Sequence, residues 1–118
     1  MAISKEMFRE LAGRELDEVL KELHFPAAAY ERVAQVALTT TDERLPQLAA
    51  AVASGDRAET QRIAHELKGV FANLRLEALA RPLADMERTA KDGGSLGVIR
   101  GGLDELSSGF EIFKIMCG

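Results

Sequence analysis

The sequence predicts an all-α protein: an up-and-down antiparallel four-helix bundle with an additional N-terminal helical segment. Apolar residues recur at helical spacing along nearly the whole chain, and no useful stretch alternates as a β-strand would. Alanine and leucine are abundant whereas aromatic residues make up only 5%, which suits closely packed helices. Short breaks separate the helical patterns, so consecutive helices should be antiparallel neighbours.

The N-terminal segment carries the first helical pattern. Ser4 can cap a helix, and an apolar stripe runs from Met7 to Leu23. Pro26 marks a break, because proline is tolerated at a helix start but not in a helix interior. A further helix is predicted after it, reaching about Leu38.

The first two bundle helices follow from their capping signals. Thr39-Thr40-Thr41-Asp42 offers caps for the first, which would place Pro46 within its first turn. Ser54-Gly55-Asp56 ends that helix and caps the second, which is predicted to reach about Leu74.

The last two bundle helices have less regular patterns. The third carries apolar residues from Leu76 to Ala90, and Pro82 inside that pattern predicts a kink or a late helix start. Ser95 opens the fourth, whose stripe reaches Phe113 but includes several glycines that weaken the prediction.

Length and charge limit the possible functions. A chain of 118 residues is most simply one domain. The net charge of −4 and pI near 5.2 argue against nucleic acid or an anionic membrane as the main partner. Cys117 is the single cysteine, so no internal disulfide can form. No signal peptide or membrane-spanning run is visible, and we expect a cytoplasmic protein.

The motif AHELKG, residues 64–69, holds the candidate reactive group. At about 100° per residue, His65 projects about 160° from the centre of the apolar face of its helix, and therefore towards solvent. An exposed position excludes the common explanation of a satisfied core histidine. The residues that form the apolar face are Ile63, Ala64, Leu67, Val70, Phe71 and Leu74.

The neighbours of His65 on the helix surface are small or cationic. Lys68 and Gly69 lie three and four residues on, and Ala58, Gln61 and Ala72 share the same side. A neutral imidazole is a good nucleophile near neutral pH, and Lys68 could neutralise the oxygens of a phosphoryl group. Glycine costs a helix roughly 1 kcal/mol, so Gly69 is explained if it gives a phosphoryl donor room to approach.

Glu87 is predicted to stand level with His65. The loop between the two helices centres near Leu76, midway between them, and residues equally far from an antiparallel turn lie at the same height. The Glu87 carboxylate could accept the Nδ1 hydrogen and leave Nε2 as the nucleophile, as in a catalytic triad. An ordinary solvated carboxylate is an equally good interpretation of Glu87 alone.

Other chemistry finds little support. His24 precedes Pro26 and has no evident partners, and two distant histidines with one cysteine give no metal-site spacing. There is no glycine-rich phosphate loop, so ATP binding is not supported.

AHELKG and its continuation VFANLRLEALARPLADME resemble histidine phosphotransfer (HPt) domains of two-component phosphorelays, specifically over residues 56–88. The helical patterns predict a single HPt-like domain over 1–118, with an N-terminal helical extension at 1–25 and the bundle core at 39–116, and the resemblance implies a four-helix bundle with its phosphoacceptor on the second helix. It implies phosphoryl transfer between aspartates of receiver domains, which belong to response regulators or hybrid histidine kinases, without kinase or ATPase activity. No cofactor is implied, since Mg²⁺ belongs to the partner receiver.

Carried over by position, the resemblance makes His65 the phosphoacceptor, with Lys68 and Gly69 supporting it and Glu87 orienting its ring. The family usually has glycine after Asn-Leu, where this chain has Arg75. Because arginine does not readily adopt the left-handed conformation, we expect the helix to continue further or to turn differently there.

Two other hypotheses about the function stay open. One is a non-catalytic helical adaptor or dimerisation module that keeps the HPt shape. The other is the phosphoacceptor domain of a chemotaxis-type histidine kinase, which would receive its phosphoryl group from a kinase ATP site. The combination of His65, Lys68 and Gly69 favours chemistry over the adaptor. Partner, direction of transfer and oligomeric state are not predicted.

Overall fold

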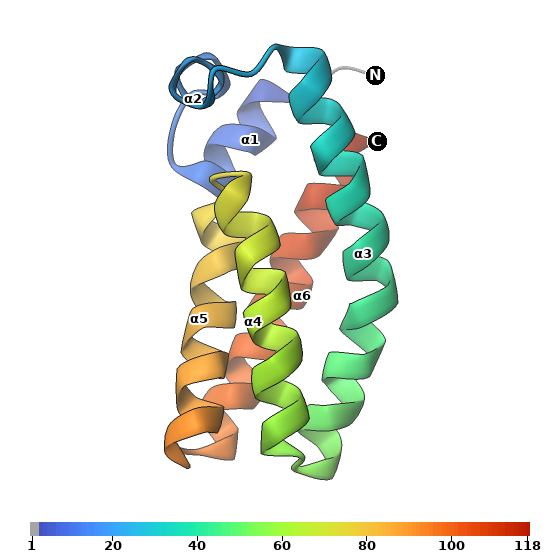
Figure 1. The fold of residues 1–118 in the computed structure, drawn as a ribbon, viewed down its shortest axis with the longest axis vertical. Helices are drawn as coiled ribbons and strands as arrows, with labels where there is room; N and C mark the ends of the chain where they lie inside the picture. The colour runs from blue at the N-terminus through green and yellow to red at the C-terminus, as the bar shows by residue number, and fades with distance from the viewer. Residues whose placement is uncertain (1–2) are drawn as a thin grey trace.

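A computed structural model describes residues 3–118, and over that range the protein is all-helical, without strands, which confirms the predicted fold class (Figure 1). Among residues 3–118, no helix is both long enough and apolar enough to cross a membrane. The helices are α1 (Lys5–Ala12), α2 (Leu16–Leu23), α3 (Ala27–Ser54), α4 (Arg57–Asn73), α5 (Glu77–Asp92) and α6 (Leu96–Cys117).

The four long helices α3 to α6 run alternately up and down and enclose one core (Figure 1). Their apolar faces meet along an elongated molecule that measures 40 × 22 × 20 Å. Phe71 of α4 packs edge-to-face on Phe113 of α6, with ring centroids 5.5 Å apart. Gly102 and Gly109 of α6 face α5, where a Cβ would lie 2.6 Å from Met86 and 2.8 Å from Leu79 respectively. These glycines let α6 approach α5 closely.

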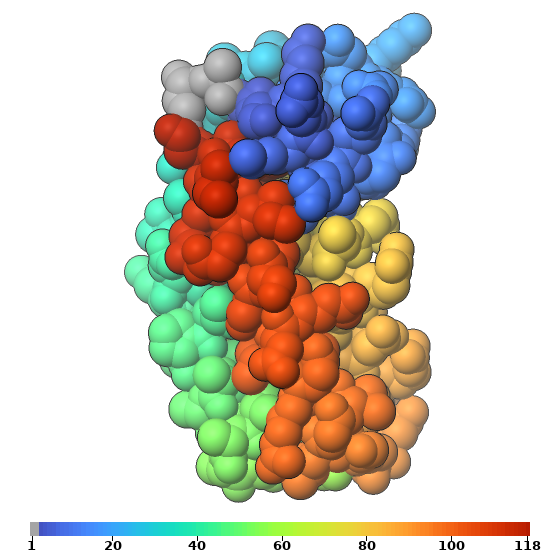
Figure 2. Space-filling view, turned by 180° about the vertical axis from the view of Figure 1, so that it is seen from behind, coloured from blue at the N-terminus to red at the C-terminus, as the bar shows by residue number. Residues whose placement is uncertain are grey.

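The N-terminal segment forms two short helices that cover one end of the bundle (Figure 1). From behind, α1 and α2 lie at the end of the molecule where α6 finishes (Figure 2). Gly13, at φ 71°, ends α1 and splits the predicted apolar stripe in two. Phe8 and Val19 are fully buried in the same core as the bundle. Met1 and Ala2 of the predicted extension lie outside the described residues.

The predicted break at residues 39–42 is wrong. α3 is one helix of 28 residues from Ala27 to Ser54, so the first bundle helix begins well before Thr39. Instead of capping a new helix, the Thr39 hydroxyl donates to the carbonyl of Gln35 at 3.2 Å, the bond that threonine makes inside a helix. Pro46 accordingly lies in the interior of α3, not in a first turn, and is tolerated there on an exposed face.

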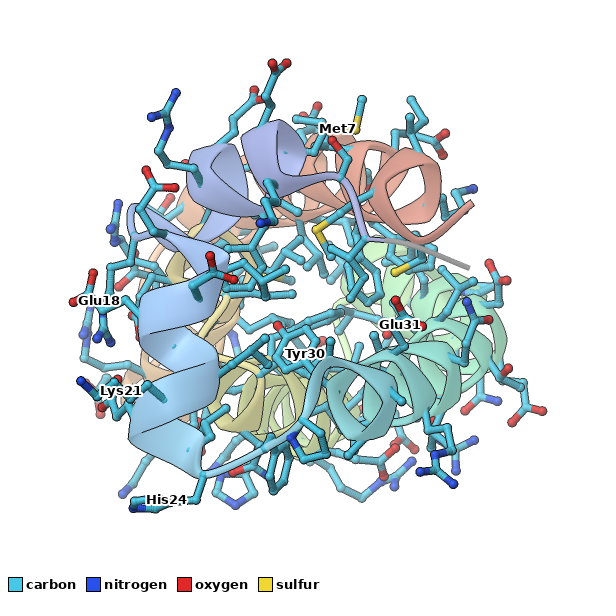
Figure 3. All side chains as sticks on the ribbon, turned by 90° about the horizontal axis from the view of Figure 1, so that it is seen from above. Met7, Glu18, Lys21, His24, Tyr30 and Glu31 are labelled. Carbon is cyan, nitrogen blue, oxygen red and sulfur yellow. The ribbon has the colours of Figure 1, made fainter. Side chains whose placement is uncertain are left out.

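The turn between α4 and α5 also differs from the prediction. Arg75 adopts the left-handed conformation at φ 63°, although it is not glycine. The turn is closed by Leu76 N–H, which donates to the carbonyl of Phe71 at 3.0 Å, the bond of a Schellman motif. The Tyr30 hydroxyl, pointing inwards from the start of α3 (Figure 3), donates to the carbonyl of Leu74 at 2.7 Å. These bonds offset the backbone strain at Arg75.

Pro82 neither delays nor ends α5, which begins at Glu77 and continues to Asp92. The proline is buried within the helix. An interior proline removes one helical hydrogen bond, and the packing of this helix face against the core keeps the element intact.

Candidate functional site

The helix that carries AHELKG begins where its capping residue predicts. The Asp56 side chain accepts a hydrogen bond from the backbone N–H of Glu59 at 3.1 Å, and α4 follows. The predicted apolar face is confirmed: Ile63, Ala64, Leu67, Phe71 and Leu74 are buried and Val70 is half-buried. On the opposite side, 69% of the His65 side chain is exposed to solvent.

Glu87 of α5 joins the two other polar residues of the predicted site. Its Oε2 lies 2.7 Å from His65 Nδ1, and its Oε1 accepts a hydrogen bond from Lys68 Nζ at 2.6 Å. Glu87 therefore stands level with His65, as predicted from its distance to the turn. That distance did not predict that Lys68 shares the same carboxylate, although Lys68 stands one turn beyond His65 on the side that faces α5.

Electrostatics keep this carboxylate charged. The hydrogen bond from Lys68 lowers the pKa of Glu87 below its ordinary value, and the hydrogen bond with His65 acts in the same direction, while partial burial opposes both. A charged carboxylate can only accept hydrogen bonds. In a neutral imidazole the hydrogen that this bond needs lies on Nδ1, which leaves the Nε2 lone pair free.

A shallow hollow lies beside the ring and is lined by Ala58, Gln61, Arg62, His65 and Glu87. Gly69, one turn beyond His65, is half-buried, and a Cβ at this position would meet no atom within 4 Å. Packing inside the protein therefore does not require glycine here. All four predicted site residues lie together at this face, three of them joined by hydrogen bonds.

Sequence reasoning missed the ion pairs around His65. Arg62 pairs with Glu59 on the same helix, and the spacing of three residues could have indicated it. Arg44 of α3 pairs with Glu66 at 2.7 Å. These two residues are equally far from the turn at Gly55, so the reasoning that found Glu87 would have found this pair too.

The remaining polar candidates lie elsewhere. His24 ends α2 in the left-handed conformation, at the bundle end that the N-terminal helices cover (Figure 3). Cys117 is buried, and burial raises the pKa of its thiol to about 11. Within residues 3–118, no three His, Cys, Asp or Glu side chains gather closely enough to hold a metal ion.

The Glu87 carboxylate makes a testable contribution to stability. Because its pKa is lower in the folded than in the unfolded protein, this contribution is present above the unfolded pKa and is lost as the pH falls through the folded one. Glu87→Gln should lower the free energy of unfolding by about 1 kcal/mol at neutral pH. The difference from the native protein should shrink below about pH 4.5, as measured by urea denaturation across pH.

Asp85→Asn is the matched control, since it removes one carboxylate from the same helix at a more exposed position, 44% accessible and paired with Arg88. It should change stability little at any pH. A Glu87→Gln difference that stays constant from neutral to acid pH would contradict the assignment.

Comparison with known families agrees with the resemblance seen in the sequence. The family model described as Hpt domain matches residues 32–109, which cover most of α3, all of α4 and α5, and much of α6. Searches of curated proteins and of solved structures found no significant match. Hpt domains serve histidine phosphotransfer in phosphorelays and interact with receiver domains. With a matching helical bundle and a match over more than half of its length, this chain belongs to the Hpt domain family.

Proposed function

We propose that this protein accepts a phosphoryl group on Nε2 of His65 from an aspartate of a receiver domain and passes it to the receiver domain of another response regulator. One observation carries the proposal: the exposed His65 has its Nδ1 2.7 Å from the Glu87 carboxylate of the neighbouring helix. A hydrogen bond from Lys68 lowers the pKa of that carboxylate and keeps it charged. The family supports the reaction class, and this geometry supports Nε2 of His65 as the acceptor atom.

The transfer balances without any further reagent. The Nε2 lone pair attacks the phosphorus of the aspartyl phosphate, an N–P bond forms, and the P–O bond to the aspartyl carboxyl breaks. The receiver carboxylate leaves with the electron pair. The ring then carries a positive charge with its hydrogen still on Nδ1, and Glu87 stabilises that charge. Transfer onward is the reverse reaction with a second receiver, whose own Mg²⁺ is expected to neutralise the phosphoryl oxygens.

Lys68 and Gly69 support this chemistry in different ways. Lys68 holds Glu87 in place and keeps it ionised, through the 2.6 Å hydrogen bond, and its charge lies close to the acceptor. Gly69 leaves the surface beside the ring without a side chain. A receiver loop can therefore bring its aspartyl phosphate within attacking distance.

Phosphotransfer from a panel of phosphorylated receiver domains, followed by intact mass spectrometry, tests the proposal. The native chain should gain one acid-labile phosphoryl group from at least one receiver. His65→Gln should gain none, because glutamine has no nucleophilic ring nitrogen. His24→Gln is the matched control and should be labelled as the native chain is. His24 ends α2, in the N-terminal segment that covers one end of the bundle, and is not part of the site on α4 and α5.

Labelling of His65→Gln would place the acceptor elsewhere and contradict the assignment. If neither receivers nor a chemotaxis-type kinase label the native chain, the protein is a non-catalytic adaptor with the HPt shape.

Gly69→Ala separates folding from access. Alanine favours the helix by up to about 1 kcal/mol over glycine, and nothing within the protein obstructs the added methyl group. The substitution should therefore raise the free energy of unfolding in a denaturation experiment. Transfer from a receiver should nevertheless slow by roughly tenfold, because the methyl group holds the donor away from the ring.

Labelling with phosphoramidate provides the control for this variant, because a small donor needs no protein surface to approach. Its rate should be unchanged by Gly69→Ala. Unchanged transfer from the receiver would show that Gly69 has no part in access.

A further inference from the structure

Two cations flank His65 on α4, one on each side. At about 100° per residue, Lys68 lies about 60° round the helix towards α5, and Arg62 lies about 60° in the opposite direction. The contacts agree with this placement. Lys68 reaches Glu87 of α5, whereas Glu66, on the same side as Arg62, reaches Arg44 of α3.

The Nε2 edge of the ring faces away from Lys68. Nδ1 is directed at Glu87, so Nε2, on the far side of the five-membered ring, points away from α5 and outwards. Lys68 is moreover already bound to Glu87, with only 33% of its side chain exposed. A phosphoryl group on Nε2 would therefore appear on the side of His65 where Arg62 stands.

Within the described part of the chain, the partner of Arg62 is a weak one. Its guanidinium pairs with Glu59, three residues earlier on the same helix, and the side chains are 58% and 41% exposed respectively. Exposed pairs of this kind contribute little to stability. A phosphoryl group carries up to two negative charges and three acceptor oxygens, so it competes well with a single carboxylate for the guanidinium.

We propose that Arg62 binds the phosphoryl group on His65, leaving Glu59 when the phosphoryl group arrives. This inference rests on the proposed function. It adds Arg62 as a phosphoryl-binding residue and Glu59 as the carboxylate that competes with the phosphoryl group for Arg62. Arg62 and His65 line one hollow, together with Ala58, Gln61 and Glu87, so the two side chains lie close to each other. The planar fork of an arginine suits two phosphoryl oxygens at once, whereas a lysine would act as a point charge.

Phosphoramidate tests this inference without a protein partner. His65 attacks the phosphorus of phosphoramidate, the P–N bond of the donor breaks and ammonia leaves. Phosphohistidine therefore forms without a second protein. The first readout is the NMR resonance of the Arg62 Nε–H, assigned by its loss in Arg62→Gln. On phosphorylation of His65 this resonance should shift strongly, whereas that of Arg88, which pairs with Asp85 on α5, should move little.

The second readout is the labelling rate. Arg62→Gln should slow labelling roughly threefold at low salt, because a solvent-exposed charge contributes modestly, and the difference should fade in high salt. Glu59→Gln frees Arg62 and should accelerate labelling. Arg100→Gln, an exposed arginine on α6, is the charge-matched control and should leave the rate unchanged.

The outcomes are distinct. If phosphohistidine forms but neither the Arg62 resonance nor the labelling rates change, the role of Arg62 is overturned and the proposed function stands. Equal slowing in Arg62→Gln and Arg100→Gln would reveal only a general charge effect, which also overturns it. If His65 gains no phosphoryl group from phosphoramidate or from any receiver, both proposals fail.

Discussion

The hydrogen bond between His65 and Glu87 depends on the register of two antiparallel helices. The carboxylate comes from α5 and the imidazole from α4, and Glu87 Oε2 lies 2.7 Å from His65 Nδ1. A shift of α5 by one residue along its axis, about 1.5 Å, would separate them. The turn between the helices sets that register: Arg75 in the left-handed conformation reverses the chain, and Tyr30 holds the preceding Leu74 carbonyl. The N-terminal helices pack over this end, where Phe8 contacts Tyr30 edge-to-face.

Three cations of α3 and α4 around the acceptor are paired with carboxylates at rest. Lys68, Arg62 and Arg44 each pair with a carboxylate of the same chain. A phosphoryl group that binds one of these three cations must therefore displace or rearrange an existing pair. The pairs differ in how readily they open. The Lys68 pair shares a partner with His65 and is the less exposed, whereas the Arg62 pair is exposed on both sides.

Much of the site could be predicted because it follows from helix geometry. The exposure of His65 follows from the apolar pattern of one helix, and the position of Glu87 follows from symmetry about one turn. The errors have local physical causes. Thr39 can cap a helix or bond back to the preceding turn, and only the packing of α3 against the bundle decides between them. Arg75 adopts a backbone conformation that its own chemistry disfavours because the Schellman bond and the Tyr30 hydroxyl stabilise the turn. Which charged side chains pair depends on competition among neighbouring groups for the same partner. Helix geometry alone therefore does not predict the second bond of Glu87, to Lys68.

The tautomer of His65 in the resting protein tests the central claim most directly. Long-range ¹H–¹⁵N NMR of the imidazole distinguishes a ring that is protonated on Nδ1 from one protonated on Nε2. In spectra of the neutral ring, the ionised Glu87 carboxylate predicts a hydrogen on Nδ1 and an unprotonated Nε2, a preference that Glu87→Gln should weaken. A ring with its hydrogen on Nε2 would contradict the account, because Nε2 would then have no lone pair with which to accept a phosphoryl group.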